Sequence, residues 1–342
     1  MKILIISNMY PSEQKPYAGI FVKNQYEALL RNIGENDSIH IFAMQRTFTS
    51  SIGSILKYFK AFVEFTPHYF KKYDIIHLHF FYPFILLVYF YKIIYPETKI
   101  IVTFHGSDIN THINGGVNQK IFKYLSKCID VPIAVGDDLA KEITHKLQLN
   151  VNEIISAGVD EKVFYSEALE KKYDFIFVGS FLEVKGFDLL VNAIKKINDI
   201  NIRFCFVGSG KLEYLLSDIM GLNFKVFKNM SQDEIRCLYN QSRFLILPSR
   251  NDSFGLVVSE GMFCGIPAIV SNQGGVRAQV RNNFNGLIIN NLTSELVAST
   301  ISTAYNISDD DYNEMVDSAL ISNKEHSMES IISKLIKIYK ND

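Results

Sequence analysis

Short apolar runs, each bounded by polar residues or glycine, recur along the whole chain and alternate with segments of helical periodicity. Runs of this length with such boundaries are typical of buried strands. The predicted strands are 3–7, 39–44, 75–79, 100–104, 132–135 and 153–156 in the first half, and 175–179, 203–207, 225–227, 244–247, 268–271 and 287–289 in the second. The pattern therefore predicts two successive series of strands.

Helix-length segments lie between these strands. In the first of them, Val22, Tyr26 and Leu29 share one helical face, and Gly34 marks its end. Segments 187–197 and 234–240 have the same periodicity. Strands that alternate with helices form parallel sheets covered on both faces. We therefore predict an α/β fold with two Rossmann-like, doubly wound parallel-sheet domains that face a central cleft.

Length and composition agree with two ordered domains. A chain of 342 residues exceeds what one hydrophobic core supports, and 48% hydrophobic with 21% charged residues is typical of an ordered protein. The polar stretch 160–172 separates the two series of strands, so we predict domains over residues 1–162 and 163–326. The net charge of -1 gives no reason to expect binding to nucleic acid.

The segment that follows residue 243 carries the most informative pattern of the chain. A strand ends at Pro248, and Asp252 and Ser253 are expected N-caps of a helix that begins near Leu256. Loops at the carboxyl ends of parallel strands bind ligands in open α/β sheets. Free N–H groups at the positive end of this helix would suit a phosphate. The residues placed to offer them are Ser253, Phe254, Gly255 and Leu256.

Two loops of the first half are further candidates. His105 and Asp108 lie just beyond the carboxyl end of the strand 100–104, and such loops often carry function. The alternative is that Asp108 caps the following turn and that His105 is only packed. Gly19 follows the first strand, where glycine either permits a tight turn or lets the backbone approach a diphosphate or sugar closely.

Three positions of the second half complete the candidates. Lys185 follows a strand by a short loop, where it would place a compact positive charge near a diphosphate. Gly208 belongs to a glycine-rich turn after the next strand, and a lone Gly-x-Gly is by itself a weak signal of ligand binding. Glu260 is on an otherwise apolar helix, where a carboxylate is costly unless it is hydrogen-bonded.

This combination of motifs resembles the retaining glycosyltransferases of family 4 (glycosyl transferases group 1), which have the GT-B fold. The family pattern is an acidic residue, a Phe-Gly turn, a Glu, a Gly-x-Pro and a Gly-Gly loop, and Asp252 and Glu260 hold the acidic positions here. A His-Gly-x-acid motif matches at His105 and Asp108, after an Asp-x-x-His strand at 74–77. The resemblance implies a metal-independent enzyme that moves a sugar from a nucleotide-diphosphate sugar to a glycan or lipid-linked acceptor in cell-surface polysaccharide synthesis.

The resemblance also implies roles for these residues. The expected catalytic residues, which would contact the transferred sugar, the acceptor or the diphosphate, are His105, Asp108, Lys185 and Asp252. The expected donor-binding residues are Gly19, Ser180, Lys185, Gly208, Ser253, Phe254, Gly255, Leu256 and Glu260, the last pairing with ribose hydroxyls. In such proteins the final helix, here 327–342, returns to the first domain.

The chain departs from the family pattern at three places. Asp252 replaces the usual Glu, and Ser180 replaces the usual Arg, for which Arg250 is a candidate substitute. The Glu expected after the Gly-Gly loop is absent, with Ala278 or Gln279 nearby. Two alternatives follow: a non-catalytic sugar-nucleotide-binding relative, and a GT-B-fold sugar-nucleotide epimerase.

We expect no metal and no cofactor beyond the donor substrate. The run Asp309 to Asp311 follows Ser308 and predicts a capped helix start, and His77 with His79 lacks a third ligand at suitable spacing. The four cysteines are widely spaced and are predicted to be buried free thiols.

We consider two apolar segments for contact with a membrane or for spanning one. Segment 52–72 mixes aromatic residues with lysines and either contacts an anionic membrane at its inner face or packs as an ordinary helix. The run 80–91 is shorter than a membrane-spanning helix and is predicted to be a buried helix. The first apolar run is too short for a secretory signal, and the free cysteines favour a reducing cytoplasm as the location.

Overall fold

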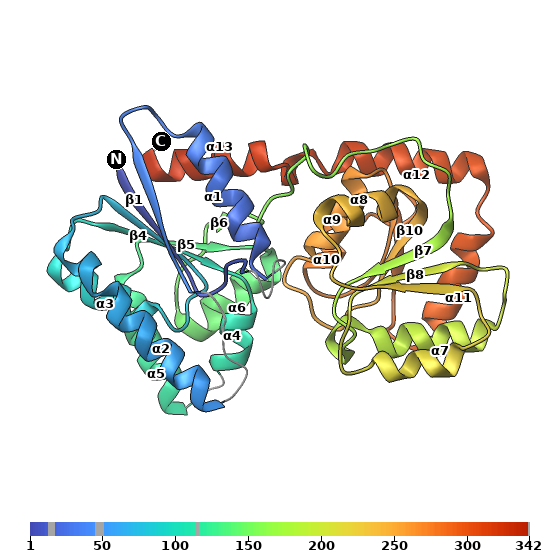
Figure 1. Ribbon diagram of the computed structural model, residues 1–342, viewed down its shortest axis with the longest axis horizontal. Coiled ribbons are helices and arrows are strands. Elements are labelled where there is room, and N and C mark those ends of the chain that lie inside the picture. Colours follow the sequence, from blue (N-terminus) through green and yellow to red (C-terminus); the bar gives the residue numbers. More distant parts are fainter. Residues whose placement is uncertain (13–17, 45–50, 114–115, 341–342) are drawn as a thin grey trace. The chain divides into compact units, whose positions relative to one another are not determined.

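A computed structural model describes residues 1–12, 18–44, 51–113 and 116–340, and of these it describes 51–57 and 110–112 by their backbone alone. The chain forms two compact units, Met1–Gly158 with Met328–Asp342, and Val159–Ser327. Each unit contains a six-stranded parallel sheet with helices on both faces (Figure 1). This confirms the predicted α/β fold with two doubly wound sheets, whereas the sequence placed the boundary after residue 162.

The sheet of the first unit has the strand order β2-β1-β3-β4-β5-β6. Its strands are β1 (Lys2–Ser7), β2 (Ser38–Ala43), β3 (Ile75–His79), β4 (Lys99–Phe104), β5 (Val131–Ala134) and β6 (Glu153–Ile154). In the register of the central strands, Ser7 lies opposite His79, and His79 lies opposite Thr103. The carboxyl ends of β1, β3 and β4 therefore meet at one edge of this sheet.

Helices α1 and α13 pack together on one face of this sheet, and α2, α3 and α5 lie on the other side (Figure 1). Isoleucines from alternate strand positions, such as Ile3 and Ile75, form one core with Leu29 of α1 and Leu335 of α13. The helices of this unit are α1 (Ile20–Asn32), α2 (Ser51–Phe65), α3 (Ile85–Ile94), α4 (Ser107–His112), α5 (Gly116–Leu125), α6 (Asp137–Leu147) and α13 (Met328–Lys340), with a 3-10 turn η1 (Thr66–Phe70).

The apolar run 80–91 differs from its prediction as a buried helix. Helix α3 begins only at Ile85, and it buries one face through residues such as Val88 and Tyr91. Its opposite face leaves Phe90 and Ile93 exposed to solvent. The run looked uniformly apolar because both faces of this helix carry large hydrophobic side chains.

The sheet of the second unit has the order β12-β11-β10-β7-β8-β9. Its strands are β7 (Tyr173–Val178), β8 (Phe204–Val207), β9 (Phe224–Phe227), β10 (Ser242–Leu247), β11 (Ala268–Ser271) and β12 (Gly286–Ile289). Its helices are α7 (Phe187–Ile197), α8 (Gln232–Asn240), α9 (Leu256–Phe263), α10 (Gly274–Gln279), α11 (Ser294–Tyr305) and α12 (Asp309–Ser322). Helices α7 and α11 pack side by side on one face, and α8, α9 and α12 lie on the other (Figure 1).

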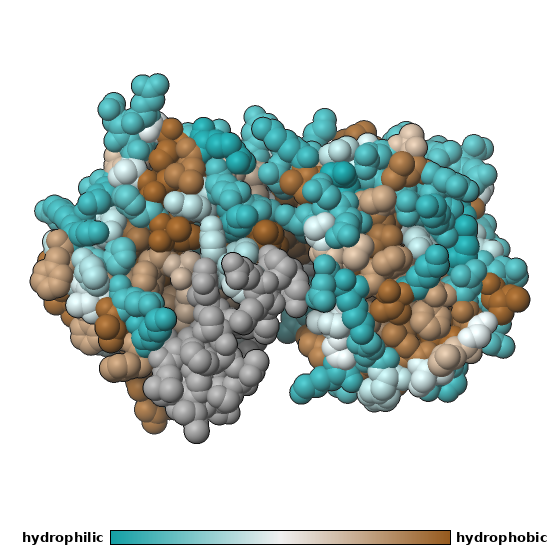
Figure 2. Space-filling view, in the orientation of Figure 1, coloured by the Kyte–Doolittle hydropathy of each residue, from teal (hydrophilic) through white to brown (hydrophobic). Residues whose placement is uncertain are grey.

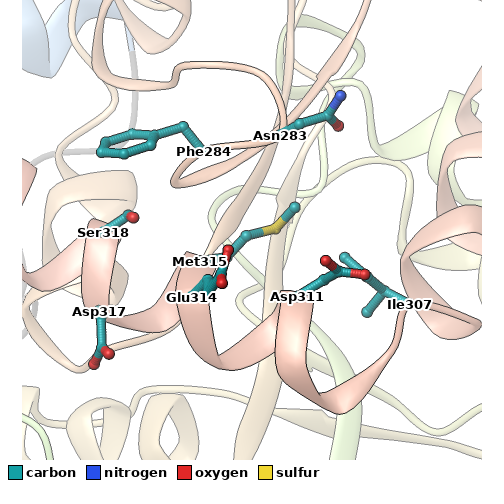
Figure 3. A pocket seen from close by; sticks show the side chains of 8 residues that line it. All are labelled: Asn283, Phe284, Ile307, Asp311, Glu314, Met315, Asp317 and Ser318. Atoms are coloured by element: carbon teal, nitrogen blue, oxygen red, sulfur yellow. The ribbon is translucent and has the colours of Figure 1, made fainter.

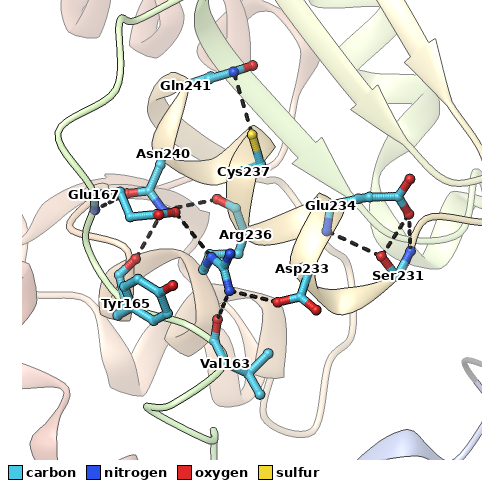
Figure 4. Close-up of polar contacts among 10 residues, drawn as sticks. All are labelled: Val163, Tyr165, Glu167, Ser231, Asp233, Glu234, Arg236, Cys237, Asn240 and Gln241. Atoms are coloured by element: carbon cyan, nitrogen blue, oxygen red, sulfur yellow. Dashed lines mark hydrogen bonds and ion pairs between the residues drawn. The ribbon is translucent and has the colours of Figure 1, made fainter.

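Segment 163–167, at the start of the second unit, is hydrogen-bonded to side chains of α8 (Figure 4). The Arg236 guanidinium donates to the Glu167 carboxylate at 3.1 Å and to the Val163 carbonyl at 3.2 Å. The Asn240 side chain accepts from the Glu167 N–H at 2.7 Å and donates to the Tyr165 carbonyl at 3.0 Å. The whole polar stretch predicted to divide the domains, 160–172, thus belongs to the second unit.

Two smaller predictions are confirmed. Ser308 caps α12 by accepting from the Asp311 N–H, so the aspartate run is a helix start. All four cysteines are free thiols as predicted, and Cys128, Cys205 and Cys264 are buried, whereas Cys237 differs from the prediction in being only partly buried.

Candidate active site

The loop between β10 and α9 is shaped by Gly255. This residue is the N-cap of α9 and has a left-handed backbone with φ of 76°. A Cβ there would lie 2.3 Å from Val276 Cγ1, so only glycine fits this turn. The prediction that Asp252 or Ser253 caps α9 is therefore wrong, because the loop makes one more turn before the helix begins. The Asp252 side chain is consequently available for another contact.

The Gly-Gly loop packs backbone to backbone against this turn. The Gly275 N–H donates to the Asp252 carbonyl at 2.7 Å. A Cβ at Gly275 would lie 2.2 Å from the Ser253 carbonyl oxygen, and one at Gly274 would lie 2.6 Å from that of Asp252. The two motifs that the sequence places after neighbouring strands therefore form one surface at the carboxyl ends of β10 and β11.

Lys185 reaches the same surface. A 3-10 turn, Glu183–Lys185, ends in left-handed Gly186, where a Cβ would lie 1.8 Å from the Pro248 carbonyl oxygen. The Lys185 ammonium donates to the Asp252 carboxylate in an ion pair, with side chains 29% and 12% exposed. An ammonium has three donors, so this contact leaves hydrogen-bonding capacity for an anion beside the loop.

Arg250 does not replace the cation expected at position 180. Its guanidinium donates two hydrogen bonds to Asp188, one to each carboxylate oxygen, with N–O distances of 2.6 Å. This pairing raises the pKa of Arg250 and directs its charge at α7. Ser180 follows β7, and its carbonyl accepts from the Leu182 N–H at 2.9 Å. The positive charge next to Asp252 is therefore that of Lys185.

Gly208 lies where the ends of β7 and β8 come closest. Its φ is 145°, and a Cβ there would lie 1.9 Å from the Gly179 carbonyl oxygen. The backbone of this turn therefore packs directly on the turn that leads to Ser180. Gly208 is needed for this close approach, which places the two predicted donor loops side by side within the second unit.

Glu260 is on the second turn of α9, and its carboxylate is largely withdrawn from water. Burial raises the pKa of Glu260 to about 7, against a smaller lowering effect of the hydrogen bond from Tyr239. The Tyr239 hydroxyl donates to Glu260 Oε2 at 3.2 Å. Tyr239 itself is buried and packs on Phe164. The carboxylate is therefore held in a weakly solvated position with unused acceptor capacity.

Two residues that contribute to this site were not singled out from the sequence. Tyr239 appeared only as part of a helical pattern, although it supplies a hydrogen bond to Glu260. Gln279 was noted as a neighbour of a missing Glu, yet its amide contacts the loop of Phe254 and Gly255. Neither carries a local signal, because each contact joins elements distant in the sequence.

In the first unit, His105 lies at the end of a row of buried histidines. His105 Nε2 is 3.2 Å from His79 Nδ1, and its ring packs on Phe80 in a tilted arrangement with a centroid distance of 4.4 Å. His77 contacts the Tyr339 hydroxyl at 2.6 Å and Thr103 Oγ1 at 2.8 Å. Burial lowers the pKa of His79 to about 3 and that of His105 well below its usual value. His105 is therefore a neutral imidazole at pH 7.

Asp108 holds the loop that carries His105. One carboxylate oxygen accepts from the N–H groups of Gly106 at 2.9 Å and Ile109 at 3.2 Å, and the other accepts from Phe81 N–H at 2.8 Å. Burial raises the pKa of Asp108, and these backbone bonds oppose that rise. The side chain thus holds its own loop, in the manner of the capping alternative, and also ties that loop to the Phe81 backbone after β3.

Gly19 meets the structural requirement for a tight turn. Its φ is 72°, and a Cβ there would lie 2.7 Å from the Met9 carbonyl carbon and oxygen. The turn joins β1 to α1 at the same edge as His79 and His105. Gly19, His105 and Asp108 are thus gathered within the first unit, and Ser180, Lys185, Gly208 and the residues 252–260 within the second.

A separate cavity lies away from all of these residues (Figure 3). It has a volume of about 550 Å³ and is open to solvent beside α12. Its lining residues are Asn283, Phe284, Ile307, Asp311, Glu314, Met315, Asp317 and Ser318. It contains none of the predicted site residues. In the described part of the chain, no three His, Cys, Asp or Glu side chains are grouped to hold a metal ion.

Two protein families match the chain in succession. The family described as Glycosyltransferase Family 4 matches residues 23–163, and the one described as Glycosyl transferases group 1 matches residues 159–320. An uncharacterized glycosyltransferase of Methanocaldococcus jannaschii is 33% identical over 193 residues, which are 55% of this chain and 53% of that relative. The chain thus spans about half the length of this curated relative.

Solved structures share the fold over the whole chain. Sucrose-phosphate synthase from Thermosynechococcus elongatus superposes with a TM-score of 0.79 at 16% identity, covering 100% of this chain and 98% of that one. HepE of Anabaena, solved with UDP and glucose, has a TM-score of 0.78 at 16% identity and full coverage of both chains. The chain therefore belongs to the glycosyltransferases that combine these two family domains on the GT-B fold.

Proposed function

We propose that the protein transfers a sugar from a nucleotide-diphosphate sugar to a glycan or lipid-linked saccharide, with retention of the anomeric configuration. The observation that carries this proposal is the arrangement of Lys185, Asp252, the start of α9 and Glu260 on one surface of the second unit. It combines a cation, free helix N–H groups and a weakly solvated carboxylate. These groups suit a diphosphate next to a ribose.

In this proposal, each group binds one part of the donor. The first N–H groups of α9 have no partner within the helix, so those of Gly255 and Leu256 bind the diphosphate together with Lys185. The Glu260 carboxylate accepts from the ribose hydroxyls, and Asp252 faces the transferred sugar. The complex of HepE with UDP and glucose supports a donor of this chemical class.

The chemistry follows from charge that develops on the leaving diphosphate. Breaking the bond between the sugar and the diphosphate leaves negative charge on the diphosphate, which Lys185 and the helix N–H groups stabilise. The acceptor hydroxyl attacks from the face that the diphosphate leaves, which retains the configuration, and its proton passes to the departing diphosphate oxygen. His105 contributes to the sugar and acceptor side as a neutral hydrogen-bonding group, and Asp108 keeps its loop in shape.

A binding and turnover assay on the purified full chain tests this function. UDP-, GDP- and ADP-sugars are screened by thermal shift, because a ligand that binds only the folded protein raises its Tm. The best donor is then incubated with saccharide and lipid-linked acceptors, and the anomeric configuration of the product is read by NMR. We expect one nucleotide class to stabilise the protein and a product of unchanged configuration. Binding without turnover would support the non-catalytic alternative, and a new sugar nucleotide formed without acceptor would support the epimerase.

We further propose that segment 52–72 contacts an anionic membrane at its inner face, where a lipid-linked acceptor would be found. Of its described side chains, Phe59 is 69% exposed and adjoins exposed Lys60 in the chain, and Phe70 is 82% exposed and precedes the exposed lysines Lys71 and Lys72. Figure 2 shows apolar groups on the surface of this unit. Other exposed hydrophobic residues on this side of the sheet are Val63, Phe90, Ile93, Ile94, Val117, Ile121 and Tyr124. In the described part of the chain, no helix has both the length and the apolar character needed to cross a bilayer.

Vesicle flotation tests this contact. We expect the protein to float with vesicles of phosphatidylglycerol and phosphatidylcholine, and less with phosphatidylcholine alone, because lysines favour an anionic surface. Phe59→Ser with Phe70→Ser should reduce the bound fraction about tenfold, since both side chains lose apolar burial in the bilayer. Ile321→Ser is the matched control, because Ile321 is 67% exposed on α12 of the other unit. Equal binding by the double variant and the control would show that this segment is not the contact.

A further inference from the structure

Gln279 occupies a buried position between the phosphate-binding loop and α9. Only 8% of its surface is exposed. Its Nε2 donates to the Phe254 carbonyl and, at 3.4 Å, to the Gly255 carbonyl. Its Oε1 accepts from the Ser259 hydroxyl at 2.7 Å. Since carbonyl oxygens only accept, the amide nitrogen must face the loop, and the partners fix the orientation of this side chain.

These contacts set the direction of two backbone N–H groups. In a trans peptide unit the carbonyl and the following N–H point in opposite directions. The Phe254 carbonyl faces Gln279, so the Gly255 N–H points away from it. The Gly255 carbonyl also faces Gln279, so the Leu256 N–H points away from it as well. The two N–H groups assigned to the diphosphate therefore point away from the buried amide.

We propose that Gln279 is a positioning residue that holds the loop 252–255 in its anion-binding conformation. Glutamine fits this role and glutamate does not, because a carboxylate cannot donate to the two loop carbonyls. The resemblance to the family had marked this region as lacking a Glu. The structure instead assigns the neighbouring amide a contact that requires a donor. The inference rests on the proposed function only for the identity of the anion.

Amide hydrogen exchange of the full chain tests the loop directly. The Val258 N–H donates to the Gly255 carbonyl at 2.8 Å, and the Gly275 N–H donates to the Asp252 carbonyl at 2.7 Å. Both amides therefore report whether the loop carbonyls stay in place. In Gln279→Glu, and in Gln279→Met as an uncharged second variant, we expect their exchange to accelerate about tenfold or more through local opening. Amides of the central strand β7 should keep their wild-type exchange rates.

Two outcomes would overturn the proposal. One is unchanged exchange of the Val258 and Gly275 amides in both variants. The other is an equal acceleration in β7, which would show that Gln279 only stabilises the whole unit. Ser259→Ala is the matched control, because it removes one hydrogen bond of the same amide and keeps both donations to the loop. Its effect on the two reporter amides should be smaller than that of either Gln279 variant.

Titration with UDP supplies the functional arm of the experiment. Gln279→Glu and Gln279→Met should both weaken UDP binding about tenfold, because the N–H groups no longer converge on the diphosphate. Ser259→Ala should weaken it less. Unweakened UDP binding by both Gln279 variants would contradict the positioning role. If the wild-type protein does not bind UDP, the proposed donor class fails, while the exchange measurement still decides the role of Gln279.

Discussion

Lys185→Ala is expected to lower the rate of sugar transfer about 100-fold to 1,000-fold, which is the effect of removing one preorganised group that stabilises transition-state charge. Lys185 supplies the positive charge beside Asp252, since Arg250 is committed to Asp188 and position 180 is a serine. The measurement is the initial rate at saturating acceptor, with kcat and KM for the donor determined separately. A variant with the turnover of the wild-type protein would remove Lys185 from the mechanism.

Two further variants show whether the lower transfer rate of Lys185→Ala is specific to this lysine and how much of it comes from repulsion between Asp252 and the diphosphate. Lys195→Ala removes a lysine of α7 that pairs with Asp218 at 3.5 Å, and it should leave the rate unchanged. Lys185→Ala also leaves the Asp252 carboxylate, 12% exposed, without its partner and near a bound diphosphate. The double variant Lys185→Ala with Asp252→Asn should therefore bind the donor more tightly than Lys185→Ala alone. A lack of any such recovery would show that repulsion by Asp252 contributes nothing.

Binding of a sugar nucleotide is expected to tighten as the pH rises from about 5 to 7, and to level off above the Glu260 pKa of about 7. Ribose hydroxyls donate to Glu260, so they favour its ionised form and lower its pKa in the complex. Below pH 7 the free protein holds a proton that binding must release, and affinity then changes up to about tenfold per pH unit. UDP-glucose is the suitable probe, because its diphosphate lacks the terminal phosphate proton that titrates in UDP.

Isothermal titration calorimetry at pH 6, in buffers of different ionisation enthalpy, measures the released proton. Glu260→Gln should abolish this release and weaken binding about tenfold or more above pH 7, the effect of losing hydrogen bonds to a charged acceptor. Glu325→Gln is a control, since Glu325 is an exposed acid of the same unit. Proton release that persists in Glu260→Gln would assign the pH dependence to another group.

The secondary structure could largely be predicted from the sequence. Each predicted strand is present within a few residues of its expected bounds, because a strand buried on both faces needs a short apolar run. The start of α12 was predicted correctly since Ser308 caps it with a local hydrogen bond. The start of α9 was predicted wrongly, although Asp252 and Ser253 are good capping residues. The helix instead begins after Gly255, whose left-handed backbone lies too close to Val276 of α10 for any larger residue.

The amino-acid sequence by itself determined the two α/β units, the positions of the ligand-binding loops at strand ends and the motifs that resemble family 4. These follow from periodicity and from short-range chemistry, both of which can be read along the chain. Only the tertiary structure decided that Lys185 pairs with Asp252, that Arg250 pairs with Asp188, and that Asp108 accepts from the Phe81 N–H after a different strand. It also gave Gln279 its contact with the loop carbonyls. The physical reason is that charge pairing and buried hydrogen bonds depend on which side chains meet in space, and those partners lie far apart in the sequence.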